Sequence, residues 1–266
     1  MAIKLIAMDL DGTLLNSDKI ISERTLKALT AAKKRGIYIT IATGRMFASA
    51  AYFGELIGAN AGIICCNGGV VKKIGAQEPE FYRTLDSETV AKAITLCHNN
   101  GWFINWYIGD EVLVERYIED YFYAYRTTKN IKFKIVGDKF LDYTQNVYQC
   151  VVRDLNGNVG KISTAVEKEC GKDKILAQQN TGFSADLTPP MVNKALGLSY
   201  LAKSLGLAPE EVMACGDADN DLAMLEYAGT AVVPANGLDS AKKLATYHAE
   251  SNDNDGIAKA IEELVL

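Results

Sequence analysis

Two aspartates stand at the end of the first apolar run of the chain. In the stretch DLDGT, which follows the apolar run of residues 3–8, a single residue separates Asp9 from Asp11. Residues i and i+2 of an extended strand point to the same side about 6.6 Å apart, so both carboxylates can address one small group. Gly12 then permits a sharp exit from the strand. Because two like charges this close are costly without a cation or a shared proton, the pair indicates a functional site.

A second acidic stretch, GDADND at residues 216–221, follows another short apolar run at residues 212–215. Its Asp217, Asn220 and Asp221 offer the hard oxygen ligands that Mg²⁺ prefers. A solvated acidic turn would explain either stretch alone. Two such stretches, each directly after a strand, favour a shared functional site.

These motifs depend on strands that alternate with helices along the chain. Strands are predicted at residues 4–8, 37–42, 63–66, 212–215 and 230–233. Their continuous β-rich apolar runs indicate parallel strands covered on both faces. Helices are predicted over residues 22–35, with Ser22 as N-cap and Gly36 as the stop, and over residues 194–205 before Gly206. The pattern predicts an α/β fold with a doubly wound, Rossmann-like parallel sheet.

Polar loops follow these strands at their carboxyl ends. Besides the two acidic stretches they include TGR at residues 43–45 and NGG at residues 67–69. In an open parallel sheet, ligands bind at the edge where the strands end. We therefore expect the four loops to converge on one site.

The character of the chain changes between about residues 84 and 187. Aromatic-rich stretches and the alternating KFKIV indicate strands with one exposed face. The predicted organisation is a core formed by residues 1–83 and 188–266, with residues 84–187 inserted as a second domain. The aromatics of the insertion are expected to serve mainly in packing; they include Trp102, Trp106, Tyr107 and Tyr123.

Composition excludes several classes of partner. The 266 residues are 48% hydrophobic and carry a formal net charge of -5, without a basic cluster, so neither nucleic acid nor a membrane is an expected partner. No signal peptide or membrane span is recognisable, and a cytoplasmic location is predicted. The six cysteines lack a CxxC pair and are expected to be buried thiols. His98 and His248 have no nucleophile context, so a histidine-based triad is not expected.

The motifs resemble, in the same order, those of the haloacid dehalogenase (HAD) superfamily, in particular its Cof-type phosphatases with a class IIB cap inserted between the second and third motifs. DLDGT matches the first motif, Thr43 in IATGR the second, Lys194 in VNKALGL the third and GDADNDLAML the fourth. NGG at residues 67–69 and SNDNDGIA at residues 251–258 look like further marks of the Cof-type group. The resemblance covers essentially the whole chain.

The resemblance implies a role for each matched residue. Asp9 would be the nucleophile that becomes a phosphoaspartate, and Asp11 the general acid and then the base that activates water. Thr43 would hydrogen-bond a phosphoryl oxygen, and Lys194 would neutralise charge on the transferring group. In the family a glycine commonly follows this lysine, whereas here Ala195 follows it and Gly197 comes two residues later.

The resemblance also implies Mg²⁺ as a cofactor. The ion would lie between the Asp9 carboxylate, the Asp11 backbone carbonyl and Asp217, with Asp221 or Asn220 in or near its coordination sphere. Further candidates for binding the substrate are Gly44, Arg45 and Asn67.

The implied activity is that of a phosphatase acting on a small phosphorylated metabolite, such as a sugar phosphate or a phosphorylated cofactor, with the insertion as a mobile cap that excludes water. A phosphomutase would share the nucleophile, the acid and the metal, and a binding or regulatory protein could use the same fold. The latter usually lacks an essential residue, and none is missing here. The sequence does not predict an oligomeric state.

Overall fold

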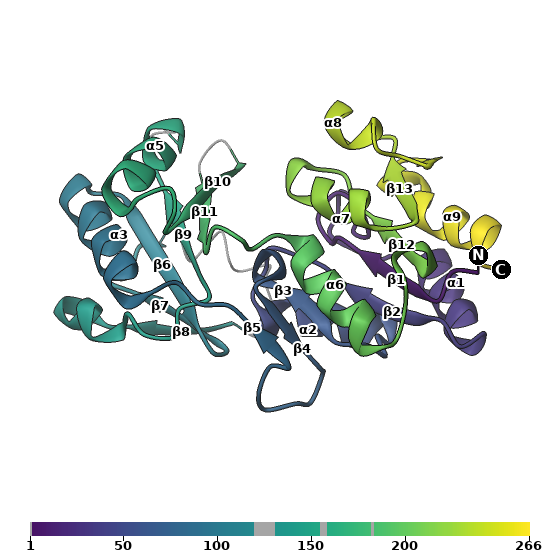
Figure 1. The fold of residues 1–266 in the computed structure, drawn as a ribbon, viewed down its shortest axis with the longest axis horizontal. Coiled ribbons are helices and arrows are strands. Elements are labelled where there is room, and N and C mark those ends of the chain that lie inside the picture. The colour runs from purple at the N-terminus through teal and green to yellow at the C-terminus, as the bar shows by residue number, and fades with distance from the viewer. Residues whose placement is uncertain (1, 120–130, 155–158, 182–183) are drawn as a thin grey trace. The chain divides into compact units, whose positions relative to one another are not determined.

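A computed structural model describes the chain except residues 1, 120–130, 155–158 and 182–183, and it forms two compact units (Figure 1). The core unit comprises Met1–Phe81 and Asn193–Leu266, and the inserted unit comprises Tyr82–Val192. The sequence places the corresponding boundaries at residues 83/84 and 187/188. The function of the inserted unit as a cap stays a prediction.

The core unit is built on a parallel sheet in the order β14-β13-β12-β1-β2. Its strands are β1 (Leu5–Met8), β2 (Tyr38–Ile41), β12 (Val212–Cys215), β13 (Thr230–Pro234) and β14 (Tyr247–Ala249). Beyond β2, a single parallel bridge from Ala42 to Ile64 leads to a second small sheet. That sheet contains β3 (Ile63–Cys65), β4 (Val70–Lys72) and β5 (Phe81–Tyr82). The predicted α/β architecture with a doubly wound parallel sheet is confirmed.

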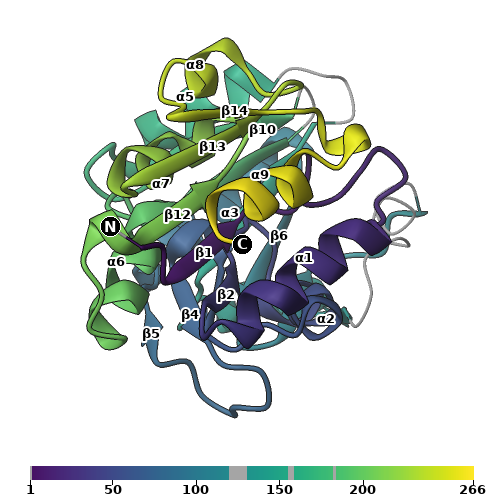
Figure 2. The same ribbon diagram turned by 90° about the vertical axis from the view of Figure 1, so that its right-hand side faces the viewer.

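Helices cover both faces of this parallel sheet. On one side α1 (Glu23–Lys34) packs against α9 (Gly256–Leu264) and α2 (Phe47–Ile57), and Figure 2 shows α1 and α9 in front of the strands. The other side carries α6 (Lys194–Ser204), α7 (Leu222–Tyr227) and α8 (Asp239–Lys242). The Ser22 hydroxyl accepts a hydrogen bond from the Thr25 N–H, so the predicted N-cap of α1 is present.

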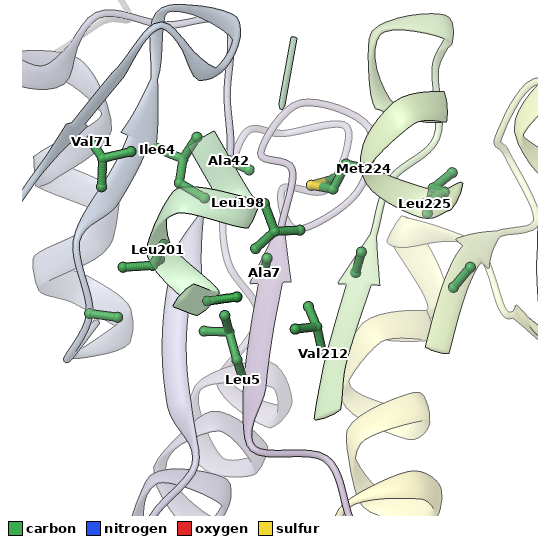
Figure 3. Packing of buried hydrophobic residues seen from close by; sticks show 14 of the residues in the cluster. Leu5, Ala7, Ala42, Ile64, Val71, Leu198, Leu201, Val212, Met224 and Leu225 are labelled. Carbon is green, nitrogen blue, oxygen red and sulfur yellow. The ribbon is translucent and has the colours of Figure 1, made fainter. Parts of the chain in front are cut away.

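Side-chain alternation along β1 fixes α6 on the sheet. Leu5 and Ala7 are fully buried against Leu198 and Leu201 of α6, and Figure 3 shows Leu198 next to the two β1 residues. Full burial of one leucine side chain contributes about 1.5–3 kcal/mol. This packing anchors α6, and with it Lys194 at the first position of the helix, against the strand that ends in DLDGT.

The inserted unit has a six-stranded sheet in the order β10-β11-β9-β6-β7-β8, antiparallel except for the parallel pair β7 and β8. Its strands are β6 (Phe103–Ile108), β7 (Glu111–Val114), β8 (Lys132–Ile135), β9 (Gln149–Arg153), β10 (Leu176–Thr181) and β11 (Ser184–Thr188). Helices α3 (Ser87–Asn100) and α5 (Val159–Cys170) pack on one face of it. The unit therefore has a hydrophobic core of its own.

Several expectations about single residues can be checked in the structure. Trp106 is fully buried in the core of the inserted unit and Trp102 packs against that core, as predicted, while Tyr123 lies outside the described residues. All six cysteines are buried free thiols. His98 pairs with Glu115, and neither histidine contacts a nucleophile in the contacts described. No helix among the described residues has both the length and the apolar character required to cross a membrane.

Candidate active site

A fully buried lysine joins two carboxylates at the carboxyl ends of β1 and β12. The Nζ atom of Lys194 donates to Oδ1 of Asp9 and to Oδ1 of Asp221, each at 2.6 Å. Lys194 opens α6, and the Asn193 side chain caps that helix by accepting from the Leu196 N–H. A cation at a helix N-terminus is disfavoured by the helix dipole, so this lysine depends on its two carboxylate partners.

Two glycines let α6 approach the NGG loop closely enough to bury Lys194. A Cβ atom added at Gly197 would lie 2.6 Å from Cγ2 of Ile64. A Cβ atom at Gly68, whose φ is +95°, would collide with the carbonyl oxygen of Asn193. Ala195 is partly exposed, and the close approach falls at Gly197 instead. The departure from the family pattern is therefore accommodated.

The two aspartates of DLDGT contact different cations. Asp9 is almost completely buried and faces Lys194. The Asp11 carboxylate binds Arg45 in a bidentate pair, at 2.7 Å to Nε and 2.8 Å to Nη2, and also binds Nζ of Lys19 at 3.0 Å. The strand ends at Met8, so the extended geometry that would aim both carboxylates at one group does not continue through Asp11.

The GDADND loop brings two more carboxylates to the same place. Oδ2 of Asp221 accepts from the backbone N–H groups of Asp217 and Ala218, at 3.0 and 3.1 Å. Oδ1 of Asp217 accepts from the Thr13 hydroxyl at 2.7 Å. One carboxylate oxygen each from Asp9, Asp217 and Asp221 lie within 4.8 Å of one another. The three residues thus form a compact oxygen cluster with the geometry of a cation site.

The charge of this cluster is unbalanced. Burial raises the pKa of Asp9 to about 8, with the neighbouring carboxylates of Asp221 and Asp217 adding to the effect and Lys194 opposing it. Burial also raises the pKa of Asp217. Burial disfavours the charged form of Lys194, but Asp221 and Asp9 outweigh it and raise the pKa of the ammonium. Three carboxylates thus face one lysine, and their hard oxygen donors and excess negative charge fit a divalent cation such as Mg²⁺.

Asp11 lies in a different electrostatic environment. Burial raises its pKa, but hydrogen bonds and charge from Arg45, together with Lys19, lower it overall, so the carboxylate is held ionised. Arg45 was a predicted substrate contact, whereas here its guanidinium binds Asp11.

The remaining predicted residues form a second cluster beside the first. A Cβ atom on Gly44 would lie 2.9 Å from Oδ1 of Asn67, and the same oxygen accepts from Nδ2 of Asn220 at 3.2 Å. The hydroxyl of Thr43 accepts from the Arg45 N–H at 3.2 Å, and the Thr43 side chain is buried. The TGR, NGG and GDADND loops therefore meet, as expected for loops at the carboxyl edge of one sheet. Asn220 turns its amide toward Asn67, whereas Asp221 contacts Lys194.

Three residues that contact the site were not among the predicted ones. Thr13 binds Asp217, Lys19 binds Asp11, and Asn236 donates to the Gly12 carbonyl at 2.8 Å. Asn236 lies in the polar turn after β13, so the rule that singled out the other strand ends could also have identified it. Lys19 gives no such signal in the sequence, because its contact depends on the path of the loop.

Comparison with known proteins identifies the family of the chain. The family profile described as haloacid dehalogenase-like hydrolase matches residues 6–261. The 5-amino-6-(5-phospho-D-ribitylamino)uracil phosphatase YitU of Bacillus subtilis is 30% identical, with 97% of this chain and 96% of the relative covered. A phosphoglycolate phosphatase of Methanothermobacter thermautotrophicus is 28% identical over 98% of this chain and 99% of its own length.

A solved structure is also similar over nearly the whole chain. It is a haloacid dehalogenase-like hydrolase from Bacteroides thetaiotaomicron with a TM-score of 0.90 and 30% identity, covering 98% of each chain. The predicted enzyme class, a phosphoric monoester hydrolase, is confirmed by the family match and by relatives named as phosphatases. The chain therefore belongs to the haloacid dehalogenase-like hydrolases.

Proposed function

We propose that the protein is a Mg²⁺-dependent phosphatase that hydrolyses a small phosphorylated metabolite through a phosphoaspartate on Asp9. The observation that carries the proposal is the buried cluster in which Lys194 binds Asp9 and Asp221 at 2.6 Å, with Asp217 beside them. If Lys194 only formed a structural ion pair, one carboxylate would be enough to balance its charge. Three carboxylates at the end of two parallel strands are better explained by a site for a phosphoryl group and a cation.

In the first step, a carboxylate oxygen of Asp9 attacks phosphorus and the bond from phosphorus to the leaving oxygen breaks. Lys194 holds the Asp9 carboxylate in a fixed orientation and neutralises charge on the transferring group. The Thr43 hydroxyl donates to a phosphoryl oxygen. Gly44 lacks a side chain at the point where Asn67 packs against it, and both residues are proposed to contact the phosphoryl group.

Asp11 supplies and later removes the proton. As general acid it protonates the leaving oxygen, and as general base it takes a proton from the water that attacks the phosphoaspartate. In the resting structure Asp11 is paired with Arg45 and Lys19. It must therefore take up a proton and turn from these cations before the first step. Arg45, once released, is available to bind the substrate.

Asp9, Asp217 and Asp221 would hold Mg²⁺, together with the backbone carbonyl of Asp11, and Asn220 lies next to this set. When bound, the ion supplies positive charge that lets the anionic substrate approach an anionic nucleophile. The chain provides the oxygen donors and the buried setting for it.

The substrate is proposed to be a sugar phosphate or a phosphorylated cofactor. The two named relatives act on a phosphoribityl compound and on phosphoglycolate, both small phosphate monoesters. The named substrates of these relatives differ although each relative matches nearly the whole chain, which supports the proposal that the inserted unit acts as the cap that selects the substrate.

A phosphate-release screen of the purified protein against phosphorylated metabolites tests this function. We expect release in Mg²⁺, none in excess chelator, and almost none from Asp9→Asn, whose amide is nearly isosteric but not nucleophilic. Phosphate returned to a bound sugar without release would indicate a phosphomutase. Inactivity on the whole panel would favour a binding or regulatory protein. Substantial turnover by Asp9→Asn would refute the covalent route.

A further inference from the structure

The segment that follows the catalytic aspartates is held from outside by residues near the C-terminus. Nδ2 of Asn252 donates to the Leu15 carbonyl at 2.9 Å. The Asp253 carboxylate accepts from the N–H and the hydroxyl of Ser17, both at 2.8 Å. These contacts join positions more than 230 residues apart in the sequence.

Asn236 is the link between this C-terminal region and DLDGT. Its Nδ2 donates to the Gly12 carbonyl at 2.8 Å, and its Oδ1 accepts from the Asn252 N–H at 3.0 Å. The side chain thus uses both its donor and its acceptor, one on each segment. In the same turn the Leu238 N–H donates to the Asp217 carbonyl at 2.8 Å. One turn after β13 therefore contacts both acidic loops.

The geometry of the motif SNDNDG explains how Asn252 and Asp253 are presented. Asp255 has a φ of +58°, and a Cβ atom on Gly256 would collide with the Glu250 carbonyl oxygen. Only glycine fits there, so the chain turns tightly into α9. The turn leaves Asn252 and Asp253 facing residues 12–17. Hydrogen bonds from the Ser17 backbone and hydroxyl lower the pKa of Asp253, which keeps it ionised.

We infer that Asn236, Asn252 and Asp253 are positioning residues of the reaction, which fix residues 12–17 and thereby the backbone from which the Asp11 side chain turns to meet the leaving oxygen. The inference rests on the role proposed above for Asp11. It assigns a task to the SNDNDG motif and to Asn236, neither of which contributes to the chemistry directly.

The nucleophile is held by a different set of bonds. The Asp9 N–H donates to the Cys215 carbonyl at 2.9 Å, and the Leu14 and Leu15 N–H groups donate to the carbonyls of Asp9 and Leu10. These backbone hydrogen bonds do not involve the side chains of Asn236, Asn252 and Asp253. Removing a hydrogen bond made by one of those side chains should therefore misplace Asp11 while Asp9 stays in position. Misplacement by about 1 Å can cost on the order of a hundredfold in rate.

The hydrogen bonds of Asn236 and Asp253 are exposed to solvent, so their loss should affect stability little. A matched control is Asn60, another asparagine that bridges two backbone groups in the core unit. It donates to the Ile37 carbonyl and accepts from the Ile39 N–H, at the amino end of β2 and hence at the opposite edge of the sheet.

The test compares Asn236→Ala, Asp253→Ala and Asn60→Ala in the full chain, with 4-nitrophenyl phosphate and the sugar phosphate that the screen shows to be hydrolysed fastest. A nitrophenolate leaves without a proton, whereas a sugar alkoxide needs one. We expect kcat for the sugar phosphate to fall about ten- to a hundredfold in the first two variants. On the aryl ester the loss in kcat should be at most about threefold. Asn60→Ala should leave kcat unchanged on both substrates. Asp253→Asn, which keeps an acceptor oxygen, should restore part of the loss.

Backbone hydrogen exchange of residues 13–17 provides a readout besides activity. Exchange should quicken at Asn16 and Ser17 in Asn236→Ala and Asp253→Ala and stay unchanged in Asn60→Ala. The Leu14 and Leu15 N–H groups, which donate to the carbonyls of Asp9 and Leu10, should stay protected in all three variants. Equal losses on both substrates with unaltered exchange would overturn the inference. If Asp11→Asn loses no more activity on the sugar phosphate than on the aryl ester, the proposed role of Asp11 fails. Quickened exchange would then show only that the three side chains hold the segment, and their part in the reaction would be overturned.

Discussion

At the scale of single residues, the proposed cation site can be tested at Asp217. Asp217 is held by Thr13 and lies within 4.8 Å of Asp9 and Asp221. Asp217→Ala should raise the Mg²⁺ concentration for half-maximal phosphate release by more than about tenfold, because one of the three proposed carboxylate ligands is lost. Mg²⁺ titration of initial rates measures this effect.

The control for that variant is Asp219→Ala in the same loop. Its carboxylate accepts from the Ser240 hydroxyl at 2.6 Å and does not belong to the oxygen cluster. It should leave the Mg²⁺ requirement unchanged. A similar shift in both variants would mean that loop shape or net charge, rather than coordination by Asp217, sets the requirement for the metal.

The residues that meet at the candidate site could largely be located from the sequence, whereas their contacts could not. The motifs single out Asp9, Asp217 and Lys194, and the structure brings these three residues together. The ion pairs of Asp11 with Arg45 and Lys19 follow from the path of the loop after Met8, which no local pattern encodes. Residue types indicate a chemistry, but a contact between distant loops needs the fold.

At the scale of elements, the position of Lys194 depends on how closely α6 approaches the NGG loop. In Gly197→Ala the new methyl group would meet Ile64 and lie 3.0 Å from the Gly68 carbonyl oxygen. We expect a loss of about 1–3 kcal/mol in the free energy of unfolding. We also expect a fall in kcat, since the helix that carries Lys194 must shift. Urea unfolding and phosphate-release assays measure the two effects.

The reverse substitution beside it, Ala195→Gly, is the matched control. Ala195 is partly exposed, so this change should cost only about 1 kcal/mol of helix propensity and leave kcat nearly unchanged. If Gly197→Ala folds as well as the wild type and turns over normally, close packing of α6 is not what positions the lysine.

Helix α3 of the inserted unit has an N-cap, Asp86, whose side chain can be protonated. Asp86 caps α3 by accepting from the N–H and the hydroxyl of Thr89, and the Thr89 side-chain hydrogen bond is the main cause that lowers the pKa of Asp86. A folded pKa below the unfolded value of about 3.9 stabilises the protein above that pH, and this stabilisation is lost as the pH falls through the folded pKa. Asp86→Ala should therefore cost about 0.5–2 kcal/mol near pH 7 and progressively less below about pH 4.

Tryptophan fluorescence can follow this effect, because Trp102 and Trp106, the only two tryptophans of the sequence, both belong to the inserted unit. Urea unfolding of wild type and Asp86→Ala at several pH values gives the difference. Asp86→Asn keeps a capping oxygen without a charge, so its stability relative to Asp86→Ala should not vary with pH. A cost of Asp86→Ala that stays constant down to pH 3.5 would contradict the linkage.

The strands near the site could be predicted to within a residue or two, since buried parallel strands have continuous apolar runs. β12 has the predicted bounds, and β1 and β2 are shorter than predicted by one and two terminal residues.

Helix α2 is not predicted from the sequence. Its residues FASAAYFGELI lack a side-chain cap and are apolar on most sides, so the helix has no clear amphipathic period. Its helical state depends on burial against the small second sheet.

At the scale of the whole molecule, the aromatic-rich and alternating stretches between residues 84 and 187 predict an insertion but do not predict the order of its strands. Pairing of β7 with β8 in parallel inside an otherwise antiparallel sheet depends on long-range contacts. The core unit and the inserted unit each have a separate hydrophobic cluster. The candidate catalytic residues, from Asp9 to Asp221, all belong to the core unit.

This separation predicts the result of removing the inserted unit. The Phe81 ring contacts the Tyr200 ring of α6 with centroids 4.8 Å apart, and Asn193 precedes Tyr200 by seven residues, about 10 Å along a helix. A linker of about four residues can therefore replace Tyr82–Val192.

The remaining protein should fold, bind Mg²⁺ and hydrolyse 4-nitrophenyl phosphate, and Asp9→Asn should abolish this hydrolysis. Its rates on different sugar phosphates should converge, because selection is assigned to the cap. Retained selectivity in a folded, active deletion variant would place specificity in the core unit instead.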